Sequence, residues 1–387
     1  MFTTPAGDTD ANRVHSSCAE WPISFYGSVQ LIRDPLAPPL LLAVSLTSLD
    51  QSRGKVLARL LQSRDRIGDW LRTAPIQATG TSDGGGIAGQ LDTADRRTFV
   101  YGEVTGYWLS WSSVYAPDRV RMGAAVEFLR RQWSRARAAQ TRLGAPLDWR
   151  NRAAFSFDLA MMMRGLAAAA PIVGSTRCAG AAARLTPWLE RLVDTDGSLR
   201  SHLVLAQGNV PTRWSTLPGA YQAKTAAALL CTPNGWLPTR VLDAARLTLA
   251  RYGRHAVDHR NLHARFYAFE GLLLCGAHVP SADVLDVAYG AFCFPEEVGA
   301  PVCVNRSDVQ AQALRLLCLL PDAPGHTIDG IAANLLQFVR DDGSVAFSAG
   351  DLGANVWCAL FAHQALDWRC SLRGDAAGHA PRASDII

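Results

Sequence analysis

The chain has 387 residues, of which 49% are hydrophobic, and a formal net charge of +4 at pH 7. This length and apolar content are enough for a large globular domain, and the small net charge argues against a surface built to bind nucleic acid. The apolar run 39–46 is far shorter than the about 20 residues that a membrane span needs. The first fifteen residues also lack the apolar core of a signal peptide. We therefore expect a cytoplasmic protein with no membrane span and no nucleic-acid partner.

Residues 1–50 are rich in Pro, Ser and Asp around one short apolar stretch, which favours an N-terminal arm or cap. A helical pattern begins near Arg53, so we expect a main domain over 51–370 and a flexible tail over 371–387. Nine cysteines without a C-x-x-C pair indicate buried free thiols rather than disulfides or a zinc site. The sequence has no phosphate-binding or dinucleotide-binding motif either, so neither a metal nor a cofactor is predicted.

Two kinds of helix alternate within the main domain. Amphipathic segments with an Arg-rich or Ala-rich polar face are expected to be outer helices, over residues 53–73, 121–141, 178–194, 238–253, 281–293 and 326–339. Segments that are apolar nearly all round are expected to be inner helices, over residues 101–116, 154–169, 220–232, 261–276, 306–320 and 353–368. Helices without a polar face belong between other helices rather than at a surface.

Asp-Gly turns follow three of the outer helices, at residues 83–84, 196–197 and 342–343. Glycine permits the positive φ that a tight turn requires. An outer helix, a turn and a polar-headed inner helix, repeated along the chain, form the signature of a hairpin repeat. We predict an all-α protein, an (α/α)6 toroid of six hairpins, with few strands. An open α-solenoid is the alternative.

Each predicted inner helix begins with a polar or charged cluster, and in a closed ring these N-termini face one side. Unpaired N–H groups and the helix dipole make such a side attractive to anions, and aromatic faces there suit sugar rings. The residues predicted to bind substrate are Trp108, Tyr221, Lys224, Arg265, Arg306, Asp308, Asn355 and Trp357.

Two groups within these clusters suggest acid/base chemistry, and they contain the predicted catalytic residues. Glu103 and Tyr107 lie one helical turn apart, and Asp158 heads the next inner helix; glycoside hydrolysis requires such a pair of carboxyls. His263 and Tyr267 are also one turn apart, beside an arginine, which suits proton abstraction in epimerisation or elimination. The alternatives are helix capping for the carboxylates and a buried, hydrogen-bonded histidine for His263.

Several motifs occur in a recognisable order: DGGGIAG (83–89), GEVTGYW (102–108), FSFD (155–158), YQAK (221–224), LHARFYAFEGLLLCG (262–276) and Asn355. This set resembles a bacterial family of α/α-toroid proteins that are encoded with polysaccharide-biosynthesis genes. That family is similar in architecture to six-hairpin sugar enzymes and to prenyltransferase and squalene-cyclase toroids. The resemblance implies the toroid fold and a role in polysaccharide biosynthesis.

The chain departs from the family pattern at three of these places. Asp158 is followed by Leu-Ala-Met instead of Thr-Gly-Gln, and residues 307–310 read Ser-Asp-Val-Gln instead of Gly-Asn-Ala-Gln. Asn355 is followed by Val356, and a lysine that the family carries in this helix is missing. Changes at helix heads indicate a substrate that differs from the family's, and a secondary-metabolite pathway is one reason for such divergence.

These patterns predict an enzyme that acts on a sugar-like, anionic substrate, either a small molecule or an oligosaccharide, by epimerase, lyase or hydrolase chemistry. One alternative is a non-catalytic binding or scaffold module of a glycan-assembly complex. Another is a toroid cyclase or transferase that takes an apolar substrate. Carboxylates at the helix heads favour sugar chemistry, whereas an aromatic pocket poor in carboxylates favours a cyclase.

Overall fold

The computed structural model describes residues 40–80, 83–134, 141–145, 148–253, 261–277, 279, 282–285, 306–372 and 378–387. The chain divides into two compact units, Met1–Ser52 and Arg53–Ile387. Most of the predicted N-terminal arm and most of the outer helix predicted over 281–293 lie outside the described residues. The second unit contains all the segments that were predicted to be helices.

The helices alternate as predicted. The outer ones are α1 (Leu40–Thr73), α3 (Arg119–Gln132), α5 (Ser175–Arg191), α7 (Thr239–Gly253) and α11 (Gly325–Leu335). The inner ones are α2 (Gly102–Tyr115), α4 (Ser156–Val173), α6 (Gln222–Leu230), α8 (Leu262–Leu274), α10 (Ser307–Cys318) and α12 (Val356–Ser371). Short 3-10 helices lie at η1 (Trp149–Arg152), η3 (Leu336–Phe338) and η4 (Ala383–Asp385).

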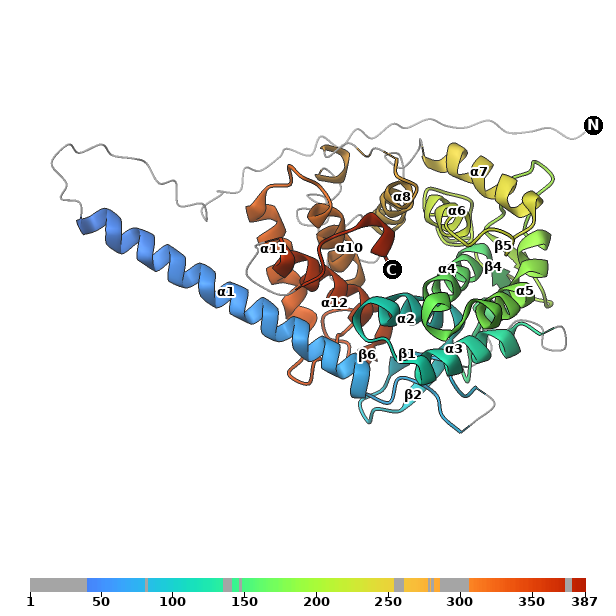
Figure 1. Ribbon diagram of the computed structural model, residues 1–387, viewed down its shortest axis with the longest axis horizontal. Coiled ribbons are helices and arrows are strands. Elements are labelled where there is room, and N and C mark those ends of the chain that lie inside the picture. The colour runs from blue at the N-terminus through green and yellow to red at the C-terminus, as the bar shows by residue number, and fades with distance from the viewer. Residues whose placement is uncertain are drawn as a thin grey trace, which may run out of the picture. The chain divides into compact units, whose positions relative to one another are not determined.

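The inner helices form a closed ring. Each packs against the next in the order α2, α4, α6, α8, α10 and α12, and α12 packs back against α2. The outer helices α3, α5, α7 and α11 pack around this ring against the inner ones (Figure 1). The closure confirms the (α/α)6 toroid and excludes the open solenoid, whose first and last inner helices would not meet.

Helix α4 is long and apolar enough to cross a membrane when judged by length and composition alone. However, 67% of its 18-residue window is buried inside the fold. It packs between α2 and α6, and a position inside the ring accounts for its apolar character.

Short strands run directly into several inner helices, which was not predicted. The strands are β1 (Ala88–Leu91), β2 (Arg97–Tyr101), β3 (Arg142–Leu143), β4 (Ala153–Phe155), β5 (His202–Val204) and β6 (Ala354–Asn355). One antiparallel sheet has the order β3-β2-β1-β6, with Ala88 opposite Val100 and Leu91 opposite Ala354, and β4 pairs with β5. Strands this short show no period-2 pattern in sequence. They fix the entry of the chain into α2, α4 and α12.

The predicted Asp-Gly turns are confirmed. Gly85, Gly197 and Gly343 have positive φ angles of 96°, 83° and 89°. In the second and third turns, the aspartate carboxylate accepts a hydrogen bond at 2.9 Å from the backbone N–H of the serine that follows the glycine. Glycine is needed there because other residues are strained at such φ values.

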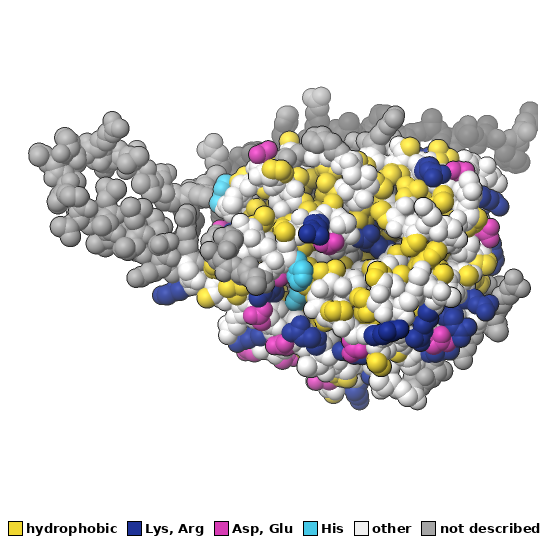
Figure 2. Space-filling view, in the orientation of Figure 1, with side chains coloured by type: hydrophobic (Ala, Val, Ile, Leu, Met, Phe, Trp, Pro, Cys, Tyr) yellow, Lys and Arg dark blue, Asp and Glu magenta, His cyan; other side chains and the backbone are white. Residues whose placement is uncertain are grey.

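The end of the chain is packed against the ring, which differs from the predicted flexible tail. Helix α12 continues to Ser371, and Ile386 and Ile387 are buried. Figure 1 shows the C-terminal residue at the middle of the ring, and Figure 2 shows apolar side chains gathered around the middle of the same face. A short polar segment gives no periodic signal, yet two isoleucines at its end are enough to anchor it among apolar residues.

Glycines allow the backbones of neighbouring inner helices to approach closely. A Cβ atom on Gly165 would lie 2.3 Å from the carbonyl oxygen of Gly106, so α4 and α2 touch through their backbones there. Likewise, a Cβ atom on Gly271 of α8 would lie 2.5 Å from the backbone nitrogen of Lys224 on α6. These positions leave no room for a side chain, and they set the spacing of the ring.

We expect Gly165→Ala to lower the free energy of unfolding by about 1–3 kcal/mol, the usual cost of forcing extra atoms into a packed interior. Urea denaturation followed by circular dichroism measures the change. The matched control is Gly180→Ala on α5, where a Cβ atom meets nothing within 4 Å. There the better helix propensity of alanine should stabilise by up to about 1 kcal/mol. Equal effects of the two substitutions would contradict the close contact of α2 and α4.

Candidate active site

The rim of the ring is defined here as the N-terminal ends of the inner helices together with the residues that lead into them. At the rim, the carboxyl groups of Glu103 on α2 and Asp158 on α4 lie close enough to shift each other's pKa. The hydroxyl of Tyr101, the last residue of β2, donates to Oδ2 of Asp158 at 3.3 Å. The side chains of Tyr101 and Tyr107 lie close enough to Glu103 to lower its pKa, against the larger effect of burial. The two carboxyls therefore share one polar site between neighbouring helices.

Burial raises the pKa of both carboxyls, and that of Asp158 rises well above its usual value. The negative charge of Glu103 raises the pKa of Asp158 further, while Arg142 acts in the opposite direction. Burial therefore favours the protonated form of both carboxyls, and more strongly that of Asp158. Such a pair can supply a proton to a bound substrate.

His263, in the first turn of α8, is held by α10. Its Nδ1 lies 2.5 Å from Oε1 of Gln312, and its Nε2 lies 3.8 Å from Oδ2 of Asp308. Since an amide oxygen only accepts, Nδ1 carries the ring proton in this amide orientation, and Nε2 keeps its lone pair. Burial lowers the pKa of His263 to about 4, although the charge of Asp308 acts in the opposite direction. His263 is therefore neutral at pH 7 and able to accept a proton.

Asp308 is fully buried, with 0% of its surface exposed, yet it is ionised. Arg306 donates to its two oxygens at 3.1 and 2.5 Å, and the indole N–H of Trp357 donates at 3.5 Å. Burial alone would raise the pKa of Asp308, but the charge and the hydrogen bonds of Arg306 outweigh it and lower that pKa below its usual value. The predicted substrate-binding residue Arg306 thus holds Asp308 in place.

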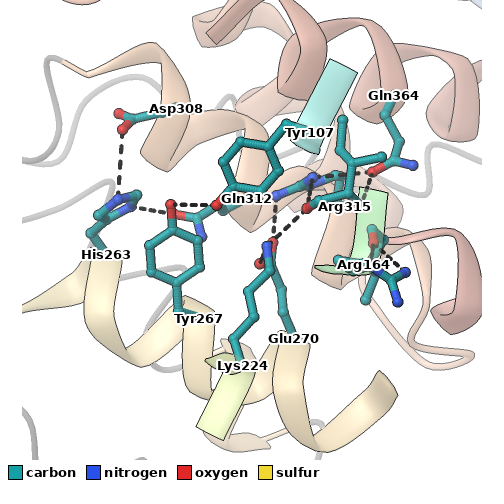
Figure 3. A network of polar contacts seen from close by, with 12 residues as sticks. Tyr107, Arg164, Lys224, His263, Tyr267, Glu270, Asp308, Gln312, Arg315 and Gln364 are labelled. Atoms are coloured by element: carbon teal, nitrogen blue, oxygen red, sulfur yellow. Dashed lines mark hydrogen bonds and ion pairs between the residues drawn. The ribbon is translucent and has the colours of Figure 1, made fainter. Parts of the chain in front are cut away.

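Two tyrosines connect the carboxyl pair with the histidine. The hydroxyls of Tyr107 on α2 and Tyr267 on α8 lie 3.5 Å apart, and these helices are opposite each other in the ring. The ring of Tyr267 also lies 4.3 Å from that of His263, between centroids. Figure 3 shows Asp308, His263, Tyr267 and Tyr107 in this succession. All five predicted catalytic residues therefore lie in one connected cluster.

Half-buried aromatic side chains stand beside this cluster. Trp214, in the loop before α6, packs its ring edge-on against His263, with centroids 5.4 Å apart. The ring centroid of Phe157 lies 4.8 Å from that of Tyr267, and the ring centroid of Trp357 lies 5.8 Å from that of Phe347. Such rings offer flat apolar surfaces beside polar groups, which is the combination that a sugar requires.

Some predicted substrate-binding residues lie away from the cluster. Trp108 is buried and faces the outer helix α3, where the guanidinium of Arg121 lies 5.4 Å from its ring centroid. Successive residues on a helix are about 100° apart, so the neighbour of an inward Tyr107 points outward. Asn355 caps α12 by accepting a hydrogen bond from the N–H of Cys358 at 3.0 Å.

Tyr221 and Arg265 were both predicted to bind substrate. Tyr221 is buried, its ring is edge-on to Trp214 at 5.5 Å, and its hydroxyl donates to the carbonyl oxygen of Ser215 at 3.1 Å. It therefore supports the tryptophan. Arg265 is half-buried on α8, two positions from His263.

Lys224 lies at the N-terminal end of α6, but its side chain turns into the ring, with 0% of its surface exposed (Figure 3). Its Nζ donates to Oε2 of Glu270 on α8 at 2.7 Å, and Arg315 on α10 donates to the other oxygen of Glu270 at 2.5 Å. The Lys224 ammonium also lies 5.3 Å from the ring centroid of Tyr107 and 4.8 Å from that of Tyr267. Burial lowers the pKa of Lys224 to about 8, although Glu270 counteracts this. The tyrosine pair therefore rests on a buried ion network (Figure 3).

The end of the chain completes this network through its backbone. The backbone oxygen of Ile387 accepts from Lys224 at 2.8 Å and from Arg315 at 3.3 Å. Arg164 of α4 donates to the carbonyl oxygens of Ile386 and Ser384, with its shortest bond at 2.6 Å. A charged residue inside an apolar helix needs partners, and this signal could have identified Arg164 and Arg315.

No protein-family model matches this chain, and no curated protein matches it. A cellobiose 2-epimerase from Spirochaeta thermophila is similar in structure, with a TM-score of 0.58 and 17% identity over 85% of this chain and 99% of that one. A sugar epimerase from a ruminal bacterium has a TM-score of 0.56 and 13% identity, over 83% and 99% of the two chains. A type II terpene cyclase from Scytonema has a TM-score of 0.52 and 12% identity, over 82% and 99%. These similarities establish the toroid fold, which sugar enzymes and terpene cyclases share.

We expect Glu270→Gln to lower the free energy of unfolding by about 3–5 kcal/mol, because it leaves two buried cations without their carboxylate. Urea denaturation measures this change. The control is Asp243→Asn, which removes the carboxylate of an exposed ion pair with Arg246 on α7 and should cost less than about 1 kcal/mol. A similar cost for both would show that the network does not depend on the charge of Glu270.

We expect Asp158→Asn to keep the fold, since the amide can donate to Glu103 and accept from Tyr101. A carboxyl whose pKa rises on folding contributes stability that is present below its unfolded value, near 4, and is lost as pH rises through the folded value. The wild type should therefore lose stability relative to the variant as pH increases above about 4. Melting temperatures measured from acidic to alkaline pH test this. Parallel profiles for the two proteins would mean that Asp158 does not hold a proton.

Proposed function

We propose that this chain is an enzyme that moves a proton on a carbon atom of a sugar-like substrate bound at the rim, by epimerase or lyase chemistry. His263 accepts the proton through Nε2, and Asp158 supplies one. The proposal rests on a histidine whose pKa is lowered and a carboxyl whose pKa is raised, on different helices of one rim, with Tyr107 and Tyr267 between them. A group with a raised pKa and a group with a lowered pKa in one cluster are characteristic of acid/base catalysis.

Hydrolysis is less well supported than proton transfer at carbon. Glycosidases hold their two carboxyls about 5–9.5 Å apart, on either side of the bond that breaks. Glu103 and Asp158 shift each other's pKa, so they act as one coupled unit rather than as two separate carboxyls. The third carboxylate, Asp308, is fully buried and bound by Arg306.

The polar side chains and the aromatic surfaces support a sugar as the substrate class. Three carboxyls and a histidine suit hydroxyl groups better than an apolar terpenoid, which argues against the cyclase alternative. Arg142, which lies 5.2 Å from the ring centroid of Tyr101, and the helix N-termini favour a substrate with an anionic group. The names of two similar structures, a cellobiose 2-epimerase and a sugar epimerase, agree with this class. A pathway of polysaccharide or secondary-metabolite biosynthesis rests on the motif resemblance.

Deuterium exchange tests the proposal independently of the final product. Purified protein is incubated in D2O with cellobiose or with glucuronic acid, and loss of C–H signals is followed by proton NMR. An epimerase or lyase exchanges a carbon-bound proton with solvent, whereas a hydrolase does not. His263→Gln should slow the exchange by about 10²–10⁴-fold, the usual contribution of a general base.

The matched control is His326→Gln. His326 is an exposed histidine on the outer helix α11. It should leave the exchange rate unchanged. Unchanged exchange in His263→Gln would overturn the assignment of the base. Binding of a sugar without any exchange would favour the non-catalytic binding module instead.

The pH profile of the exchange reaction should also report on His263. Its pKa is lowered to about 4 by burial, so the base stays neutral well below the usual histidine value of about 6.5. The rate should therefore fall only as pH drops through about 4, where His263 becomes protonated. A rate that falls near pH 6.5 would contradict the buried, neutral state of this base.

A further inference from the structure

Two cysteines meet at the end of the inner helices that is opposite to the rim. Cys231 is the C-cap of α6, and Cys275 is the C-cap of α8, the next helix in the ring. Sγ of Cys231 lies 3.7 Å from the carbonyl oxygen of Leu274, the residue before Cys275. The two thiols also lie close enough to shift each other's pKa. Cys231 and Cys275 are far apart in the sequence, so the sequence does not predict this contact. It arises because α6 and α8 are neighbours in the ring.

Both cysteines are exposed, unlike the other cysteines that the structure describes, which are buried at positions 178, 318, 358 and 370. The sequence predicted buried thiols throughout, and for this pair the prediction is wrong. Each lies one residue beyond its helix, where the chain leaves the core. An oxidant in solution can therefore reach this pair.

The surroundings of Cys231 favour its reactive form. The hydrogen bond from Cys275 lowers the pKa of Cys231 to about 6, burial acts against this, and the charge of Arg164 adds to the lowering. In contrast, burial raises the pKa of Cys178 to about 11 and that of Cys318 to about 12. Since the thiolate is the nucleophile, Cys231 is the member of the pair that attacks first.

We propose that Cys231 and Cys275 are a redox modification site, at which a small-molecule disulfide converts them reversibly into a disulfide bond between α6 and α8. The Cys231 thiolate attacks one sulfur of the reagent, which forms a mixed disulfide and releases one thiolate. Cys275 then loses its proton and attacks the Cys231 sulfur, which releases the second small thiol. The two protein thiols are oxidised, the reagent disulfide is reduced to two thiols, and excess thiol reverses the reaction.

The bond would join two helices that already share the buried Lys224–Glu270 ion pair. Arg164, which lies close enough to influence Cys231, also holds the backbone of residues 384 and 386. The pair therefore adjoins the place where the end of the chain is anchored. The cysteine pair lies at the opposite ends of the inner helices from the acid/base cluster. The proposed redox site therefore does not depend on the proposed function.

Peptide mapping tests the proposal on the folded full-length protein. The protein is incubated with glutathione disulfide at neutral pH, remaining thiols are alkylated, and the digest is analysed by mass spectrometry. The expected product is one cross-linked peptide pair that contains Cys231 and Cys275, and dithiothreitol should remove it. In Cys275→Ser the cross-link should be lost, and Cys231 should instead remain as its mixed disulfide with glutathione.

Cys178→Ser, which changes a buried thiol on α5, is the control and should leave the cross-link intact. Melting curves of the serine variants establish that each is folded before it is compared. Mapping of the wild type is decisive by itself. Separate glutathione adducts on both cysteines without a cross-link, or a cross-link of either one to a different cysteine, would overturn the proposal.

Discussion

The buried ion network of Glu270, Lys224 and Arg315 is the interaction on which the centre of this protein depends. It ties α6, α8 and α10 together where no water is available to the charges. Buried ions are tolerated only when their remaining hydrogen-bonding groups are satisfied. Here one carboxylate faces two cations, and the backbone oxygen of Ile387 supplies a further acceptor to both cations. The end of the chain is therefore part of the core of the ring.

The tyrosine pair rests on this network, and the rim is built on the tyrosines. The low polarity of the interior makes it costly to bury the ions of this network. It also shifts the pKa values of the titratable residues at the rim. Burial raises the pKa of Asp158 and lowers that of His263, and the opposite charges near them, Arg142 and Asp308, do not outweigh it. Asp308 is buried as deeply but has Arg306 beside it, so it stays ionised. One environment thus yields an acid, a base and a fixed charge, and the neighbours of each group decide which it becomes.

The sequence was sufficient to predict the ring of helices, but not how deeply each side chain is buried in it. Alternation of amphipathic helices with helices that are apolar all round implies two concentric layers, and polar helix heads imply a shared rim. That reasoning brought Glu103, Asp158, His263 and Tyr267 together correctly. It placed Lys224 at the rim, because a single lysine near a helix start does not reveal that Glu270 and Arg315 draw it inward. It also missed the strands before α2 and α4, whose few residues carry no period, and the outward turn of Trp108.

The chemistry of such a ring is set by few residues, and this explains why fold similarity alone does not reveal the reaction. The inner helices contact one another through glycines and apolar side chains along their length, so their heads can change without moving the helices. A toroid with carboxyls and a histidine at these heads has polar groups that can exchange protons with a hydroxylated substrate. The same ring with only aromatic heads would instead surround an apolar one. The identity of the residues at positions 103, 158, 263 and 308 therefore carries more functional information than the whole of the helical framework beneath them.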